Sequence, residues 1–133
     1  MTDGERIERE REWVKARYAC TVDAAFKTLV AVIESDVQSF NRLSSNDDCE
    51  VKHVDYRTVT FSRGSRVTAV SISGQTIEVR PMRSNAILKV IHITPKWNEE
   101  SMSCDLVIDG KAMSMHRASQ RAIGDILFPR GDT

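Results

Sequence analysis

Long apolar runs are absent from this 133-residue sequence. A transmembrane helix needs roughly 18–20 consecutive apolar residues, so we expect no membrane-spanning segment. The N-terminal residues are charged throughout and do not form a basic cap before an apolar stretch, so we expect no secretory signal. Apolar residues nevertheless make up 41% of the chain and charged residues 29%. These fractions indicate a globular chain with a core and exclude wholesale disorder.

Cysteine is scarce as well. The three cysteines, Cys20, Cys49 and Cys104, are widely spaced and form no CxxC pair. An odd number of cysteines without a paired motif is typical of free thiols in a reducing compartment. We therefore predict free thiols and a cytoplasmic location.

Catalytic and nucleotide-binding motifs are also missing. The sequence contains no HExxH, GxSxG, GxxxxGK[ST] or GxGxxG. These absences remove sequence support for a zinc site, a hydrolase elbow or a phosphate loop, and we predict no metal and no cofactor. Active sites also assemble from scattered residues, so an enzyme stays open as an alternative while binding is the expectation.

The strongest structural signal is an amphipathic segment from Val22 to Leu43. Its large apolar residues recur at steps of three and four, which places them on one face of a helix. Burying six such side chains contributes roughly 9–18 kcal/mol before conformational entropy is subtracted. We expect this helix to organise the core through Val22, Phe26, Leu29, Ile33, Val37 and Phe40.

A highly charged segment precedes this helix. Thr2 and Glu5 form a Thr-x-x-Glu capping box, which predicts a helix over residues 1–20. Its apolar stripe is narrow, so we expect it to lie on the rim of the domain or to reach a second copy of the chain. Thr21 is a suitable N-cap for a separate second helix, but an unbroken helix over residues 3–43 is the alternative. The stripe comprises Ile7, Trp13, Val14 and Tyr18.

From Glu50 onward, apolar residues recur with a period of two, which predicts strands. Short turns between them indicate an antiparallel meander of five to six strands. Residues 50–61 contain a phase change, which predicts a bulge or two short strands. The remaining strands are predicted at residues 66–73, 76–82, 86–94, 102–108 and 111–113.

Residues 86–94 differ from the other strands because both parities are apolar. Such a strand is expected in the middle of a sheet with a cover on each face. One cover is the helix over residues 22–43. The other is the C-terminal helix, the N-terminal helix or another subunit. Residues 95–100 are predicted to form a loop.

The chain ends in a further amphipathic segment. Ser114 is a suitable N-cap, Met115, Ala118, Ala122 and Ile126 share one face, and Pro129 stops the helix. The fold class is therefore α+β in one domain over residues 1–133: an N-terminal helix or helical hairpin, an antiparallel meander and a C-terminal helix.

Charge is unevenly distributed although the formal net charge is zero. Residues 50–97 carry 8 basic and 3 acidic side chains, while the segments on either side are acidic. Arg66 and Arg80 lie on adjacent predicted strands and could come together on one sheet face, where guanidinium groups suit carboxylates and phosphates. The candidates for binding a ligand or an anionic partner are Arg57, Arg66, Arg80, Arg83 and Lys89.

Few aromatic residues accompany these arginines, and the whole chain is not basic. Base-stacking side chains are nearly absent between them, so a nucleic-acid-binding module is an alternative that we expect to fail. A second alternative is an enzyme or small-ligand carrier with a pocket between the long helix and the sheet. Its candidate pocket residues are His53, Tyr56 and His92.

The leading functional prediction is a small binding or scaffold protein. The apolar residues at 86–94 and on the N-terminal helix exceed what a chain of this length needs to bury within itself. We therefore predict a homo-oligomer, most simply a two-fold dimer, with a further protein as a possible partner.

Overall fold

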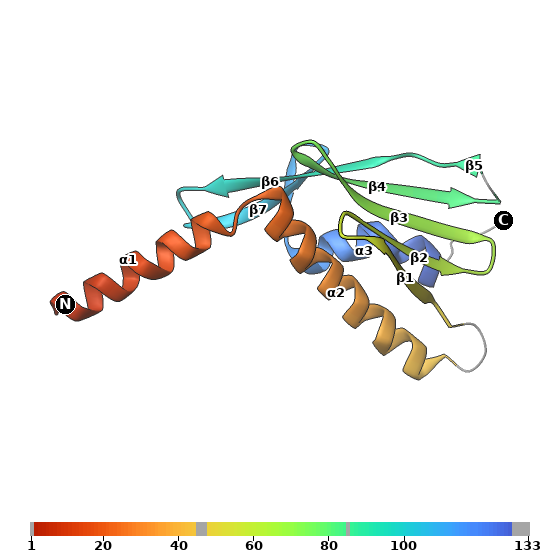
Figure 1. Ribbon diagram of the computed structural model, residues 1–133, viewed down its shortest axis with the longest axis horizontal. Coiled ribbons are helices and arrows are strands. Elements are labelled where there is room, and N and C mark those ends of the chain that lie inside the picture. The colour runs from red at the N-terminus through yellow and green to blue at the C-terminus, as the bar shows by residue number, and fades with distance from the viewer. Residues whose placement is uncertain (1, 45–47, 85, 129–133) are drawn as a thin grey trace.

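Two helices, an antiparallel sheet and a third helix follow one another along the chain in the computed structural model (Figure 1). The structure describes residues 2–44, 48–84 and 86–128. This arrangement confirms the predicted α+β class. The helices are α1 (Asp3–Tyr18), α2 (Val22–Leu43) and α3 (Met115–Leu127); the strands are β1 (Glu50–Asp55), β2 (Thr58–Arg63), β3 (Arg66–Ser73), β4 (Thr76–Arg83), β5 (Ala86–Ile87), β6 (Ile91–Asn98), β7 (Ser103–Ile108) and β8 (Lys111–Met113).

The sheet is a meander in the order β1-β2-β3-β4-β6-β7-β8, with β5 paired to β4. All pairings are antiparallel, as predicted, but the eight strands of the described sheet exceed the predicted five to six. Residues 50–61 form two strands, β1 and β2, which was one of the two predicted outcomes. Asp109 and Gly110 both have positive φ, which matches the tight hairpin between β7 and β8.

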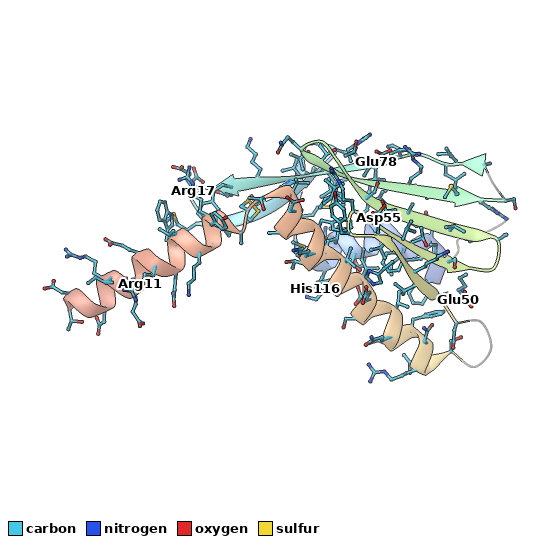
Figure 2. The ribbon with its side chains drawn as sticks, in the orientation of Figure 1. Arg11, Arg17, Glu50, Asp55, Glu78 and His116 are labelled. Atoms are coloured by element: carbon cyan, nitrogen blue, oxygen red, sulfur yellow. A yellow bond between two sulfur atoms is a disulfide. The ribbon has the colours of Figure 1, made fainter. Side chains whose placement is uncertain are left out.

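The N-terminal segment forms two separate helices, which confirms one of the two predicted alternatives; the unbroken helix over residues 3–43 is not formed. Thr2 and Glu5 form the capping box of α1, and the Thr21 hydroxyl accepts a hydrogen bond from the backbone N–H of Ala24 at the start of α2. No residue of α1 is buried, and its side chains extend into solvent around the helix (Figure 2). α1 projects away from the sheet, whereas α2 lies along it (Figure 1).

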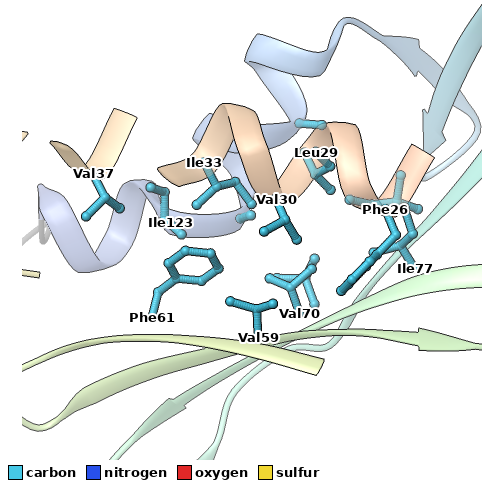
Figure 3. Close-up of a cluster of buried hydrophobic side chains, with 14 of the residues drawn as sticks. Phe26, Leu29, Val30, Ile33, Val37, Val59, Phe61, Val70, Ile77 and Ile123 are labelled. Atoms are coloured by element: carbon cyan, nitrogen blue, oxygen red, sulfur yellow. The ribbon is translucent and has the colours of Figure 1, made fainter. Parts of the chain in front are cut away.

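α2 and α3 pack against each other and cover the same face of the sheet (Figure 3). The predicted periodicity of α2 is confirmed, because its apolar face fills the space between helix and sheet. On α3, Ala118 and Ala122 are buried as predicted, while Pro129 lies outside the described residues. The largest fully buried side chains are Phe61, Leu29, Ile33, Ile77, Ile93, Leu106, Ile108, Ile123, Val37, Val59, Val70 and Val79.

The other sheet face is not covered by any described helix (Figure 1). Its residues alternate with the core residues along each strand, as Thr60 does with Phe61 and Ala69 with Val70. Many of them are small or polar side chains that are half-buried among their sheet neighbours. The described chain therefore has a helix-covered face and an open face.

The prediction for residues 86–94 is wrong. β5 ends at Ile87, β6 begins at Ile91, and both pair with β4. Ile87 lies opposite Met82, whereas Ile91 lies opposite Val79, so the pairing slips by one residue between them. This slip reverses the side-chain direction and leaves Ile87 57% exposed.

Apolar residues occur at both even and odd positions of this segment because the register changes by one residue between β5 and β6. They do not indicate a strand that is covered on two faces. The loop predicted at residues 95–100 is also wrong in part, because β6 continues to Asn98 and pairs there with Ser103 of β7.

The prediction that all three cysteines are free is wrong. Cys20, which follows α1, forms a disulfide with Cys104 of β7, with a Cα–Cα distance of 5.3 Å. The two cysteines are 84 residues apart, so their pairing depends on the tertiary fold. Cys49 is free and buried, and this burial raises the pKa of its thiol.

None of the helices in the described part of the chain combines the length and apolar character needed to cross a bilayer.

Candidate functional site

The five basic residues predicted to bind an anionic partner are spread over several parts of the sheet. Arg66 shares its face with the buried Thr68 and therefore points toward the helices. Arg80 lies opposite Ala69 and next to the buried Val79, which directs it to the open face. The prediction that Arg66 and Arg80 share one face is therefore wrong. Arg80 lies opposite Ala69, which is three residues from Arg66 along β3, so the two arginines point to opposite faces of the sheet.

The structure instead aligns three arginines on the helix-covered face. Arg63 of β2, Arg66 of β3 and Arg83 of β4 occupy directly paired positions across the three strands. Arg63 belongs to the basic segment and is not among the five predicted binding residues. A signal for this row was available in the turn at residues 63–66, because a two-residue hairpin sets Arg63 opposite Arg66.

Two arginines of this row bind the C-terminus of α3. Arg63 Nη1 donates hydrogen bonds to the carbonyl oxygens of Ile126 and Leu127 at 3.1 and 3.2 Å. Arg66 Nη1 donates to the carbonyl of Asp125 at 2.9 Å. Cations at this position satisfy terminal carbonyls and complement the negative end of the helix dipole. Arg63 and Arg66 thus anchor α3 to the sheet.

A groove between the C-terminal half of α2, α3 and strands β3 and β4 is lined by part of the predicted basic set. Arg66, Arg83 and Lys89 line it together with apolar residues such as Leu88 and Ile91. The remaining two candidates lie elsewhere: Arg57 is exposed in the turn between β1 and β2, and Arg80 is 2.5 Å from Glu78 on the open face. The predicted binding residues therefore do not form one site.

The structure does not bring the predicted pocket residues together. His53 Nε2 lies 2.6 Å from a carboxylate oxygen of Glu34 on α2, and Tyr56 is 85% exposed in a turn. His92 lies on the open sheet face, opposite Glu78. The space between α2 and the sheet is occupied by core side chains, among them Leu29 and Phe61, which are both fully buried.

Among the described residues, no group of three or more His, Cys, Asp or Glu side chains is arranged to hold a metal ion.

A different candidate surface is the projecting helix α1, which we call the arm (Asp3–Tyr18). Its base is fixed to the domain by the Cys20–Cys104 disulfide and by an ion pair between Arg17 and Glu99 at 3.4 Å. The Arg17 guanidinium also lies 5.6 Å from the ring centroid of Trp13, which is half-buried. These contacts hold the arm at its base and leave most of its length exposed (Figure 2).

The exposed face of the arm carries an apolar strip. Ile7, Val14 and Tyr18 are 46%, 54% and 83% exposed. At 3.6 residues per turn these three residues lie close to one line along the helix, with Arg11 beside them. Trp13, which belonged to the predicted stripe, lies about a third of a turn away and faces the base. We call Ile7, Arg11, Val14 and Tyr18 the seam.

Charges of both signs flank the seam. Glu8 and Lys15 lie along one side of it, and Glu10 and Arg17 lie along the other. An apolar line with charged flanks on a helix is the arrangement found where two helices pair. The arm is therefore a candidate surface for contact with a second helix.

Comparisons of this chain with known protein families, with curated proteins and with solved structures give no match.

Proposed function

We propose that this protein is a small binding or scaffold protein that acts as a homodimer, with the arm as its assembly element. The observation that carries the proposal is a 16-residue helix without a buried residue that is nevertheless anchored at its base. In proteins most of the stability of a helix comes from packing of an apolar face, and helices shorter than about 12–15 residues are marginal in water even when rich in alanine. A second chain packed on the seam supplies the burial that the arm lacks within its own chain.

The open face of the sheet supports the binding part of the proposal. This face is not covered by any described helix, and it presents small side chains such as Thr60 and Ala69 alongside the Arg80–Glu78 ion pair. Arginine is enriched in protein–protein interfaces, so Arg80 is the residue of this face best suited to contact a protein partner. A dimer displays two such faces and therefore binds a repeated partner with increased avidity.

Location is the part of the functional prediction that we revise. Disulfides are rare in proteins of the reducing cytosol and persist in oxidising compartments. The Cys20–Cys104 bond therefore argues against the predicted cytoplasmic location. We propose that the protein works in an oxidising environment.

Substituting Val14→Glu tests the assembly role of the arm. The substitution places a carboxylate in the seam, and by symmetry it does so twice in each dimer. Loss of apolar burial and desolvation of the charge together weaken dimerisation by at least about 100-fold. Val14 is 54% exposed in the monomer, so the free energy of unfolding of the monomer changes by less than about 0.5 kcal/mol.

Light scattering on a sizing column measures this effect at micromolar protein concentration. The matched control is Ala16→Glu, which adds the same charge on the opposite side of the arm, where Ala16 is exposed. We expect wild type and Ala16→Glu to be dimers and Val14→Glu to be a monomer. A wild type that stays monomeric on concentration overturns the proposal, as does a dimer that Val14→Glu leaves intact.

A further inference from the structure

We infer that two copies of the arm pair antiparallel, with Ile7 level with the partner's Tyr18 and Arg11 level with the partner's Val14. This inference rests on the proposed function and specifies the partner surface and its alignment. It is drawn from the order of charges along α1, from the exposure of the seam and from the direction in which the base of the arm is anchored.

The seam follows a heptad spacing. Gly4, Ile7, Arg11, Val14 and Tyr18 recur at steps of three and four, the spacing of the inward positions of a two-helix coiled coil. Trp13 and Arg17 contact the base of the domain from another side of the helix. The chain's own domain therefore leaves the seam free to receive a second helix.

The flanking charges favour the antiparallel orientation. In this alignment Glu8 lies beside the partner's Lys15, and Glu10 lies beside the partner's Arg17, which also pairs with Glu99 of its own chain. The two-fold axis repeats each contact, so four pairs of opposite charge surround the seam. Arg11 extends its methylene groups over the partner's Val14 and keeps its guanidinium in water.

A parallel pair is less favourable on the same residues. It places Arg11 against the partner's Arg11 within the seam, and it brings Asp3 close to the partner's Glu8. Only the contact between Glu10 and the partner's Lys15 is attractive in this orientation. The antiparallel pair also sets the acidic first turn of each arm beside the basic last turn of the other, so the helix dipoles are aligned favourably.

Antiparallel pairing determines where the two domains lie in the dimer. A 16-residue helix spans about 24 Å, so the arms overlap along this length and the two domains lie at opposite ends of the pair. The first turn of each arm reaches the base of the other, close to the partner's Cys20. The disulfide at each base ties the end of each arm to β7 of its own domain.

Single charge reversals distinguish the two orientations. Glu8→Lys faces the partner's Lys15 in the antiparallel pair, and Lys15→Glu faces the partner's Glu8, so each variant replaces two attractions by two repulsions. We expect each to raise the dimer dissociation constant about 10-fold at low ionic strength. Sedimentation velocity measures this constant, and Glu12→Lys is the control, because it makes the same charge change away from the seam.

Complementary variants give the decisive result. A one-to-one mixture of Glu8→Lys with Lys15→Glu restores both contacts and is expected to form heterodimers with a dissociation constant within about 3-fold of wild type. A single chain that carries both substitutions is expected to regain self-association to the same extent. Tighter association of Glu8→Lys than of wild type overturns the inference in favour of the parallel pair, which relieves the repulsion with the partner's Asp3.

The remaining outcomes separate this inference from the proposed function. A dimeric wild type whose dissociation constant is unchanged by Glu8→Lys and by Lys15→Glu overturns the antiparallel pairing and leaves a dimer built in another way. A wild type that remains a monomer overturns both. A decrease in affinity that Glu12→Lys reproduces is an effect of net charge and also counts against the antiparallel contacts.

Discussion

Replacing both Cys20 and Cys104 by serine is expected to lower the free energy of unfolding by about 2–5 kcal/mol. The disulfide joins residues that are 84 positions apart, and a cross-link over so long a segment removes much conformational entropy from the unfolded chain. It also connects the junction of α1 and α2 to β7, so its loss releases the base of the arm. Urea denaturation with and without a thiol reductant measures the change.

The third cysteine supplies the control for this prediction. Cys49→Ala keeps the disulfide, so its stability is expected to fall on reduction by the same amount as that of wild type. The double serine variant is expected to be insensitive to the reductant. A difference of less than about 1 kcal/mol between oxidised and reduced wild type contradicts the stabilising role of the Cys20–Cys104 bond.

Substituting Phe61→Ala is expected to cost about 3–5 kcal/mol of stability. The Phe61 side chain is fully buried and points from β2 toward Ile123 of α3 (Figure 3). Removing the ring leaves a cavity that sheet and helices refill only in part, because α2 and α3 are anchored to each other as well as to the sheet. Thermal or urea unfolding measures the loss.

Tyr56→Ala is the matched control for an aromatic residue outside the core. Tyr56 lies in the turn before β2 and is 85% exposed, so its removal is expected to change stability by no more than about 0.5 kcal/mol. Equal effects of the two substitutions would show that Phe61 is not part of the core. An effect of Phe61→Ala below about 1 kcal/mol leads to the same conclusion.

The sequence pattern was sufficient where a single periodicity extends over a whole element. α2 matches the predicted range from Val22 to Leu43, and β3 matches residues 66–73. In both cases one face is buried by the same neighbour along its length, so the pattern of apolar residues reports the structure directly. The caps at Thr2, Thr21 and Ser114 are also confirmed, because capping is a local interaction.

Prediction failed where tertiary contacts decide the structure. The one-residue slip between β5 and β6 puts Ile87 on the open face and Ile91 and Ile93 on the helix-covered face. In the sequence this change of face has the same pattern as a strand with two buried faces. The disulfide was missed because nothing in the local sequence of Cys20 indicates Cys104 as its neighbour.

The candidate site shows the same difference between what a local sequence pattern predicts and what tertiary contacts decide. Basic residues were correctly located in the strand-rich segment, but their grouping depends on strand register. Register places Arg66 beside Arg83 and Arg63, where two of the three bind α3, and it places Arg80 on the other face. The sequence predicts the apolar strip of the arm from Ile7, Val14 and Tyr18. Only the structure shows that Trp13 does not belong to it, because Trp13 contacts Arg17 at the base of the arm.

The attachment of the arm at its base also bears on the dimer that we propose. The arm is joined to the domain at its base by the Cys20–Cys104 disulfide, and the exposed Arg17–Glu99 ion pair adds a weak contact there. A dimer of such arms sets a defined separation between two domains. In the dimer that we propose, each domain keeps its open sheet face, so the assembly would offer two equivalent surfaces to a partner.

Photo-cross-linking from position 7 tests the pairing of the arms most directly. A benzophenone amino acid in place of Ile7 labels whatever lies next to the seam, and peptide mapping by mass spectrometry identifies the attached residue. The antiparallel pair predicts a covalent dimer with the cross-link at the partner's Tyr18 or within one turn of it. Attachment near the partner's Ile7, or the absence of any covalent dimer, would contradict the account.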